Sequence, residues 1–92
     1  MSPLSEQQIA SHLKSVPEWK VESGELVRTF SFKDFRASLA FVNKVGELAE
    51  VAGHHPDIDI RYNLVRLALV THDAGGLTTK DFDLAAAADK VV

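Results

Sequence analysis

Three histidines close together in the sequence are the residues most able to do chemistry in this chain. His54 and His55 are adjacent, and His72 follows at the far end of the next apolar run. An imidazole with an unperturbed pKa of about 6.5 can give or take a proton near neutrality. The cluster therefore indicates proton transfer, a metal site or a buried polar network.

A hairpin would bring two of these histidines together. Residues 58–62 alternate apolar and polar side chains, as in a half-buried strand, and residues 64–71 form a second strand, with Asn63 as the turn. His54 and His72 are equally distant from Asn63 along the chain. An antiparallel register that extends this far predicts His54 opposite His72, with their Cβ atoms roughly 4.5–5.5 Å apart.

The residues around the histidine pair add a carboxylate and a bend. Glu50 precedes His54 by one helical turn, where it can orient or polarise an imidazole. We expect His55 to project away from His54 or to turn outward between Gly53 and Pro56.

Other interpretations of these side chains remain open. A single histidine is more often solvated or hydrogen-bonded once than functional, and we keep that interpretation for His12, which stands apart. Three neutral imidazoles can bind zinc, but adjacent residues of an extended chain point to opposite faces, which makes His54 and His55 a poor ligand pair. By default, Asp81 is a helix-capping acid and Tyr62 a core aromatic with a solvated hydroxyl.

The overall composition narrows the class of protein. The 92 residues predict a single domain over positions 1–92, and the absence of cysteine excludes disulfides and thiolate chemistry. The net charge of −3, without a basic run, argues against nucleic-acid binding. No secretory pattern and no apolar stretch of about 20 residues is present, so we expect a soluble, cytoplasmic protein without a membrane partner.

Local signals predict seven elements. Capping boxes open helices at Ser5 and at Thr78, the latter closed by Asp81, and Asp34 is an N-cap for a long helix that ends at Gly53 and Pro56. The first helix is expected to include Val16 and to stop at Pro17. Strands are expected over residues 19–22 and 25–32, joined at Ser23-Gly24, and over the two segments of the second hairpin.

The order helix, two strands, helix, two strands, helix predicts an α+β fold, with a four-stranded antiparallel sheet and three helices packed on one face. The apolar stripe of the long helix is expected to include Phe35, Leu39 and Val42, with Phe41 and Val45 widening it. An exposed edge of so small a sheet would invite pairing with a second copy.

Spaced residues give the chain a recognisable signature. It runs through Glu50, His54-His55-Pro56, Tyr62, His72 and Asp81, and it resembles that of the pterin-4a-carbinolamine dehydratases. The resemblance extends over nearly the whole chain and implies the fold predicted above.

The resemblance also implies an activity. The substrate would be a 4a-hydroxytetrahydropterin, dehydrated to a quinonoid dihydropterin in tetrahydrobiopterin recycling, without cofactor or metal. His54, His55 and His72 would be the catalytic residues. The substrate would lie against Glu50, Gly53 and the segment Val70-Thr71-His72-Asp73, while Pro56, Tyr62 and Asp81 belong to the motif. One imidazolium acid and one imidazole base would suffice.

A protein of this family could instead be non-catalytic. Some relatives resemble dimerisation or assembly factors. The alternative is therefore a non-catalytic protein that keeps the pterin pocket and acts as such a factor, a pocket-bearing partner protein. Retention of all three histidines favours catalysis, and the family implies a homodimer or homotetramer.

Overall fold

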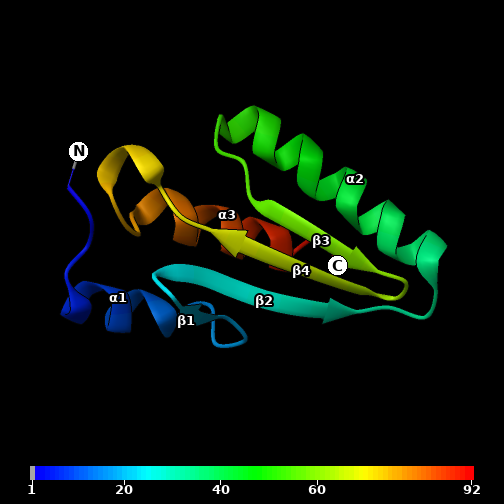
Figure 1. Cartoon of the computed structure of the whole chain (residues 1–92), viewed down its shortest axis with the longest axis horizontal. Helices are drawn as coiled ribbons and strands as arrows, with labels where there is room; N and C mark the ends of the chain where they lie inside the picture. The colour runs from blue at the N-terminus through cyan, green and yellow to red at the C-terminus, as the bar shows by residue number, and fades with distance from the viewer. Residues whose placement is uncertain (1) are drawn as a thin grey trace.

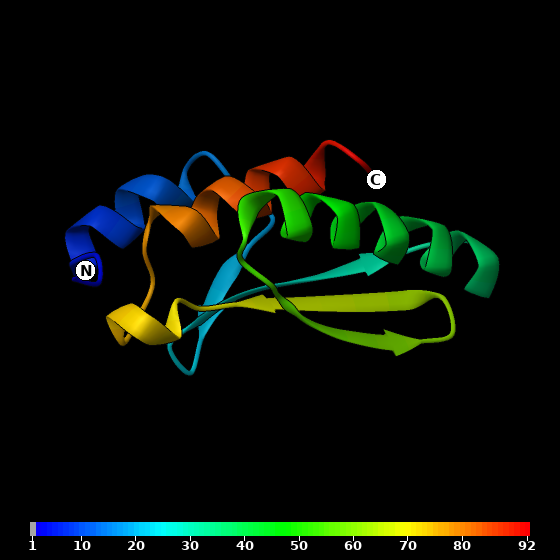
Figure 2. The same ribbon diagram turned by 90° about the horizontal axis from the view of Figure 1, so that it is seen from above.

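A computed structural model describes residues 2–92 as helices on one side of an antiparallel sheet (Figure 1). The elements are α1 (Glu6–Leu13), β1 (Lys20–Glu22), β2 (Glu25–Ser31), α2 (Phe35–Ala52), β3 (Asp57–Arg61), β4 (Leu64–Leu69), the 3₁₀ turn η1 (His72–Ala74) and α3 (Thr79–Asp89). The sheet order is β1-β2-β4-β3, with every neighbouring pair antiparallel. All three helices cover the same face of the sheet, as the view in Figure 2 shows. The predicted α+β class and element order are confirmed.

The helix ends follow the local sequence signals. Ser5 and Thr78 each close a capping box, and the Asp34 carboxylate accepts a hydrogen bond of 2.9 Å from the backbone N–H of Ala37 at the start of α2. Gly53 ends α2 in the left-handed conformation, with φ of 63°, which glycine adopts without steric cost. The first helix is shorter than expected. It ends at Leu13, and Val16 is fully buried in the turn that follows.

Apolar side chains from the sheet and from α2 and α3 form one core. Phe30 of β2 lies against Phe41 of α2, with ring centroids 4.6 Å apart, and Phe82 of α3 belongs to the same cluster. Each such side chain, when fully buried, contributes about 1.5–3 kcal/mol. This core fixes α2 and α3 over the sheet.

The buried face of α2 differs from the prediction. Phe35 and Leu39 are 46% and 40% exposed, whereas Ser38 is fully buried. The Ser38 hydroxyl donates to the Asp34 carbonyl at 3.1 Å, so a small polar residue is satisfied within the helix and can face the sheet. The helix is thus rotated about its axis relative to the predicted orientation, which apolar periodicity alone did not reveal.

The hairpin between β3 and β4 has a two-residue turn, Tyr62 and Asn63, rather than a turn centred on Asn63. Asp57 pairs with Ala68 and Arg61 with Leu64, so the pairing axis lies between Tyr62 and Asn63. Tyr62 is therefore at the tip, with φ of 53° and 64% exposure, and its assignment to the core was wrong. A register change of one residue redirects every side chain beyond it.

Candidate active site

One cleft gathers most of the residues that the sequence singled out. It has a volume of about 280 Å³ and is lined by Gly53, His54, His55, Val70, Thr71, His72, Asp73 and Lys80. The three histidines thus share one cleft. The lining comes from the segment after α2, from the segment after β4 and from the start of α3. These meet at one end of the sheet.

The histidines reach this cleft without the predicted cross-strand pairing of His54 and His72. Continuing the observed register past Asp57–Ala68 aligns His54 with Thr71, not with His72, and the regular ladder stops before either residue. The expected cross-strand pair of His54 and His72 is therefore wrong. The reason is the two-residue turn, which shifts the pairing by one position.

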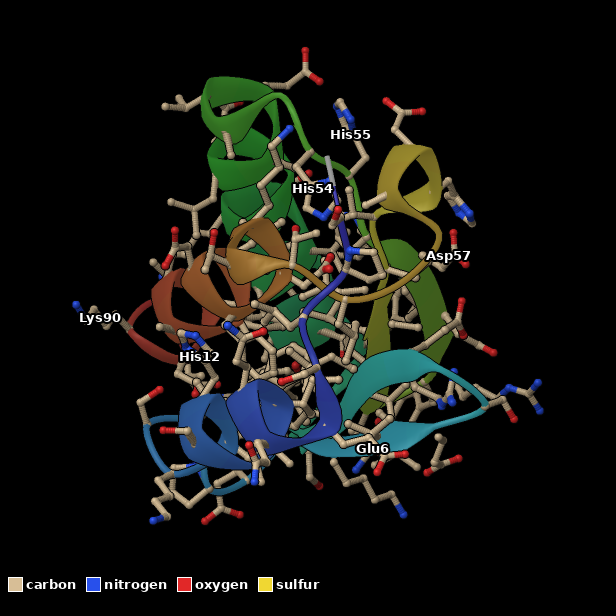
Figure 3. All side chains as sticks on the ribbon, turned by 90° about the vertical axis from the view of Figure 1, so that its left-hand side faces the viewer. Glu6, His12, His54, His55, Asp57 and Lys90 are labelled. Carbon is tan, nitrogen blue, oxygen red and sulfur yellow. The ribbon has the colours of Figure 1, made fainter. Side chains whose placement is uncertain are left out.

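His54 is fixed by a buried carboxylate instead. Its Nε2 lies 2.6 Å from Oδ1 of Asp81, and the two side chains are 12% and 0% exposed. Its backbone N–H donates to the Ala49 carbonyl at 3.2 Å, because the left-handed Gly53 turns the chain back over the end of α2. Figure 3 shows His54 in the segment that leaves α2, close to the start of α3, with His55 farther out.

Asp81 connects three separate parts of the chain. Besides His54, its Oδ2 accepts hydrogen bonds from the Thr71 hydroxyl at 2.9 Å and from the Thr78 backbone N–H at 3.0 Å. Since the Thr71 hydroxyl donates its proton to Asp81, its 2.8 Å contact with the Thr78 hydroxyl requires Thr78 to donate. The capping acid of α3 is thus also the residue that orients His54.

The far end of α3 is attached to the sheet as well. Asp89 accepts from Arg28 of β2 at 2.7 Å and from the indole N–H of Trp19 at 2.9 Å. These half-buried contacts at one end and Asp81 at the other hold α3 at both ends. A helix held in this way keeps the Asp81 carboxylate in place for His54.

Glu50 pairs with a different histidine from the one expected. Its Oε2 lies 2.5 Å from Nε2 of His55, and both side chains are largely exposed, at 75% and 62%. The reason is that His54 turns inward toward Asp81, which leaves His55 on the side of the last turn of α2. Exposed pairs of this kind contribute little to stability.

His72 and Asp73 lie on a short closed loop. Backbone hydrogen bonds join Thr71 and Gly76 in both directions, at 3.2 and 3.4 Å, and η1 occupies the residues between them. His72 is exposed. The loop therefore presents an accessible imidazole beside the partly buried His54.

Two features of the cleft escaped the sequence analysis. Lys80, in the first turn of α3, lines the cleft, and no local pattern distinguishes it from a solvated lysine. The contact of Asp81 with His54 joins residues 27 positions apart, and only its place in the signature indicated a role beyond capping.

The face of the sheet without helices has a different character. A hollow of about 250 Å³ there is lined by Thr29, Asp59, Arg61, Leu64 and Arg66, away from the histidines. Neighbouring charges are paired, and the hydrogen bond and charge of Lys20 hold the pKa of Glu22 below its usual value. We assign no chemistry to this face.

Metal centres and membrane-spanning helices each need a recognisable arrangement of residues, and residues 2–92 show neither. No group of three or more histidine, cysteine or acidic side chains is arranged to hold a metal ion within that range. None of the helices formed by these residues has the length and apolar character needed to cross a membrane.

Comparison with known proteins places this geometry in context. The sequence profile described as Pterin 4 alpha carbinolamine dehydratase matches residues 2–91. A Chloroflexus aurantiacus protein, provisionally named pterin-4-alpha-carbinolamine dehydratase, is 62% identical over 92 residues, covering 100% of this chain and 99% of its own. One from Acidobacterium capsulatum with the same provisional name is 60% identical over the full length of both chains.

Solved structures agree with the sequence comparisons. The crystal structure of a transcriptional coactivator/pterin dehydratase from Brucella melitensis has a TM-score of 0.94 and 28% identity, covering 98% of both chains. A pterin dehydratase-like protein described as a RuBisCO assembly factor in the alpha-carboxysome has a TM-score of 0.65 at 23% identity, covering 79% and 84%. The latter similarity concerns the fold alone.

Proposed function

Because this chain belongs to the pterin-4-alpha-carbinolamine dehydratase family, we propose that it dehydrates a 4a-hydroxytetrahydropterin by histidine acid–base catalysis, in tetrahydrobiopterin recycling. The observation that carries the proposal is the cleft that three histidines share, with His54 anchored on a fully buried carboxylate.

The reaction requires two proton transfers. The bond from C4a to its hydroxyl breaks as the oxygen receives a proton and leaves as water. N5 loses its proton, and a double bond forms between C4a and N5, giving the quinonoid dihydropterin. Nothing is oxidised or reduced. A positioned acid and a positioned base each accelerate such a step by about 10²–10⁴-fold.

The Asp81 contact selects the reacting nitrogen of His54. Asp81 already accepts hydrogen bonds from Thr71 and from Thr78, which favours an acceptor role toward His54 too. We therefore assign the Nε2 proton to His54, as a donor to Asp81. Nδ1 is then the nitrogen left to accept a proton from the substrate or, when protonated, to give one.

His72 is the complementary group in this proposal. It lies on the same cleft and is exposed, so it can exchange protons with solvent between turnovers. His55 would act at the rim, with Glu50 orienting it rather than His54.

The substrate ring would bind along the chain segments that form the cleft. Val70, Thr71 and Asp73 follow the end of β4, where backbone groups leave the ladder and can pair with the amide and amine edge of a pterin. Gly53, at the end of α2, also lines the cleft. A volume of about 280 Å³ is close to the lower end of small-molecule pockets, about 300–1,000 Å³.

The direct test is stopped-flow measurement of the breakdown of a 4a-hydroxytetrahydropterin with the purified protein. We expect the protein to accelerate dehydration well above the buffer rate, with no added metal or cofactor. Pterin binding by calorimetry without any acceleration would refute the proposal and would favour the alternative, a pocket-bearing partner protein.

We also propose that a second copy of the chain pairs along β3. This strand is at the edge of the sheet, where its outer backbone groups are unpaired. Its apolar residue Ile58 is 38% exposed and would be covered by such an assembly. A symmetric pair would use the same surface of each copy.

A further inference from the structure

The segment before α1 lies directly against the loop that carries His72. In Figure 3 this N-terminal segment, drawn in blue, runs up from α1 across the connection between η1 and α3. The backbone N–H of Leu4 donates to the carbonyl of Leu77 at 2.7 Å. The Leu4 side chain packs against the core cluster that contains Leu77. The two segments are thus joined by both backbone and side chain.

One residue earlier in each segment, Pro3 and Gly76 are in steric contact. Gly76 has no side chain, and a β-carbon built on it would lie 2.9 Å from Cβ of Pro3. Carbon atoms normally approach to about 3.5–4.0 Å. Cβ of Pro3 belongs to a ring closed on the backbone, so it cannot rotate away. Gly76 has no left-handed φ, which leaves Pro3 as the reason for glycine at this position.

The loop transmits this contact to the cleft. Gly76 and Thr71 form the closed base of the loop through their two backbone hydrogen bonds, and His72 is the next residue after Thr71. On the side of Thr71 the base is held by Asp81. On the side of Gly76 it rests on Pro3 and, through Leu77, on Leu4.

From this geometry we infer that Pro3 and Leu4 are positioning residues, which set the place of His72 in the cleft through Gly76 and Leu77. The inference rests on the proposed function, in which His72 transfers a proton. Displacing the base of the loop by a fraction of an ångström would move His72 relative to His54. A 1 Å misplacement of a catalytic group can cost on the order of 10²-fold in rate.

A pair of compensating substitutions tests the inference. Gly76→Ala should lower kcat by about tenfold or more, because the new β-carbon collides with Pro3. Adding Pro3→Gly removes the colliding atom and should restore kcat to within about threefold of the parent. Adding Pro3→Ala instead keeps a β-carbon and should restore little. Gly46→Ala is the control, since nothing lies within 4 Å of its β-carbon, and it should leave kcat unchanged.

A second measurement does not depend on activity. In Pro3→Gly alone, the amides of Thr71 and Gly76 should exchange with solvent several-fold faster, and the ring signals of His72 should shift, while β2 and β4 amides keep their rates. These measurements on Pro3→Gly still test the inference if Gly76→Ala fails to fold.

The outcomes separate this inference from the proposed function. An inactive parent protein would refute the proposed function, while faster exchange in Pro3→Gly would still support the contact between the N-terminal segment and the loop. The positioning role is overturned if Gly76→Ala keeps the parent kcat, if Pro3→Gly fails to rescue it, or if exchange at Thr71 and Gly76 is unchanged.

Discussion

Replacing Asp81 with asparagine should separate catalysis from folding. The substituted side chain has one acceptor oxygen and one donor amide in place of two acceptor oxygens. The oxygen is best placed at the position of Oδ2, where it can still accept from Thr71 and from Thr78. The amide then faces Nε2 of His54, which must become an acceptor. The neutral imidazole is forced into the tautomer with its proton on Nδ1.

The expected magnitudes follow from this exchange. With Nδ1 protonated, neutral His54 has no lone pair at this nitrogen to accept a proton from the substrate. The imidazolium that would give a proton loses the Asp81 carboxylate that stabilises it. In either role of His54, kcat should fall by about 10²-fold or more. The three hydrogen-bonding contacts survive without the charge that strengthens them, so the free energy of unfolding should fall by only about 1–3 kcal/mol. Asp81→Ala should cost more, about 3 kcal/mol or above, because buried donors of Thr71 and of Thr78 are left without an acceptor.

The assay combines three measurements. Stopped-flow dehydration gives kcat, urea unfolding followed by circular dichroism gives stability, and ¹⁵N shifts of the His54 ring report which nitrogen carries the proton. Asp34→Asn is a matched control, because Asp34 also caps a helix, accepting from Ala37 at 2.9 Å, but does not line the cleft. It should leave kcat unchanged. A folded Asp81→Asn protein with the parent kcat and the parent His54 tautomer would refute the reasoning.

Other perturbations have similarly specific outcomes. His54→Ala and His72→Ala should each lower the rate of dehydration by about 10²-fold or more, while binding of the product pterin falls much less. The double variant should lose little activity beyond that of the slower single variant. If both single variants fold and keep the parent rate, these histidines are structural. Glu50→Gln should lower kcat by less than about tenfold, because it acts on the exposed His55; a loss equal to that of Asp81→Asn would contradict this ranking. In analytical ultracentrifugation, the parent protein should sediment as an assembly of at least twice the 10.1 kDa chain mass. Ile58→Lys at the β3 edge should convert this assembly into a monomer. A parent protein that sediments as a monomer would refute the edge-pairing proposal.

The sequence by itself determined the elements and their order, because the signals that set them are local. Capping residues such as Ser5 and Thr78 satisfy backbone groups within a few positions, and Gly53 supplies the left-handed end of α2 wherever the helix lies. Alternation along β3 and the pair of hairpins then indicated the fold class. The signature histidines were also found in sequence, since their spacing needs no coordinates.

Only the tertiary structure decided how those residues meet. The register of β3 and β4 depends on whether one or two residues form the turn between them. The two-residue turn aligns His54 with Thr71 instead of with His72. The rotation that buries Ser38 and exposes Phe35 depends on how closely α2 approaches the sheet. Above all, Asp81 reaches His54 because α3 is held at both ends over the sheet, and contacts across 27 residues are set by packing, which no local pattern encodes.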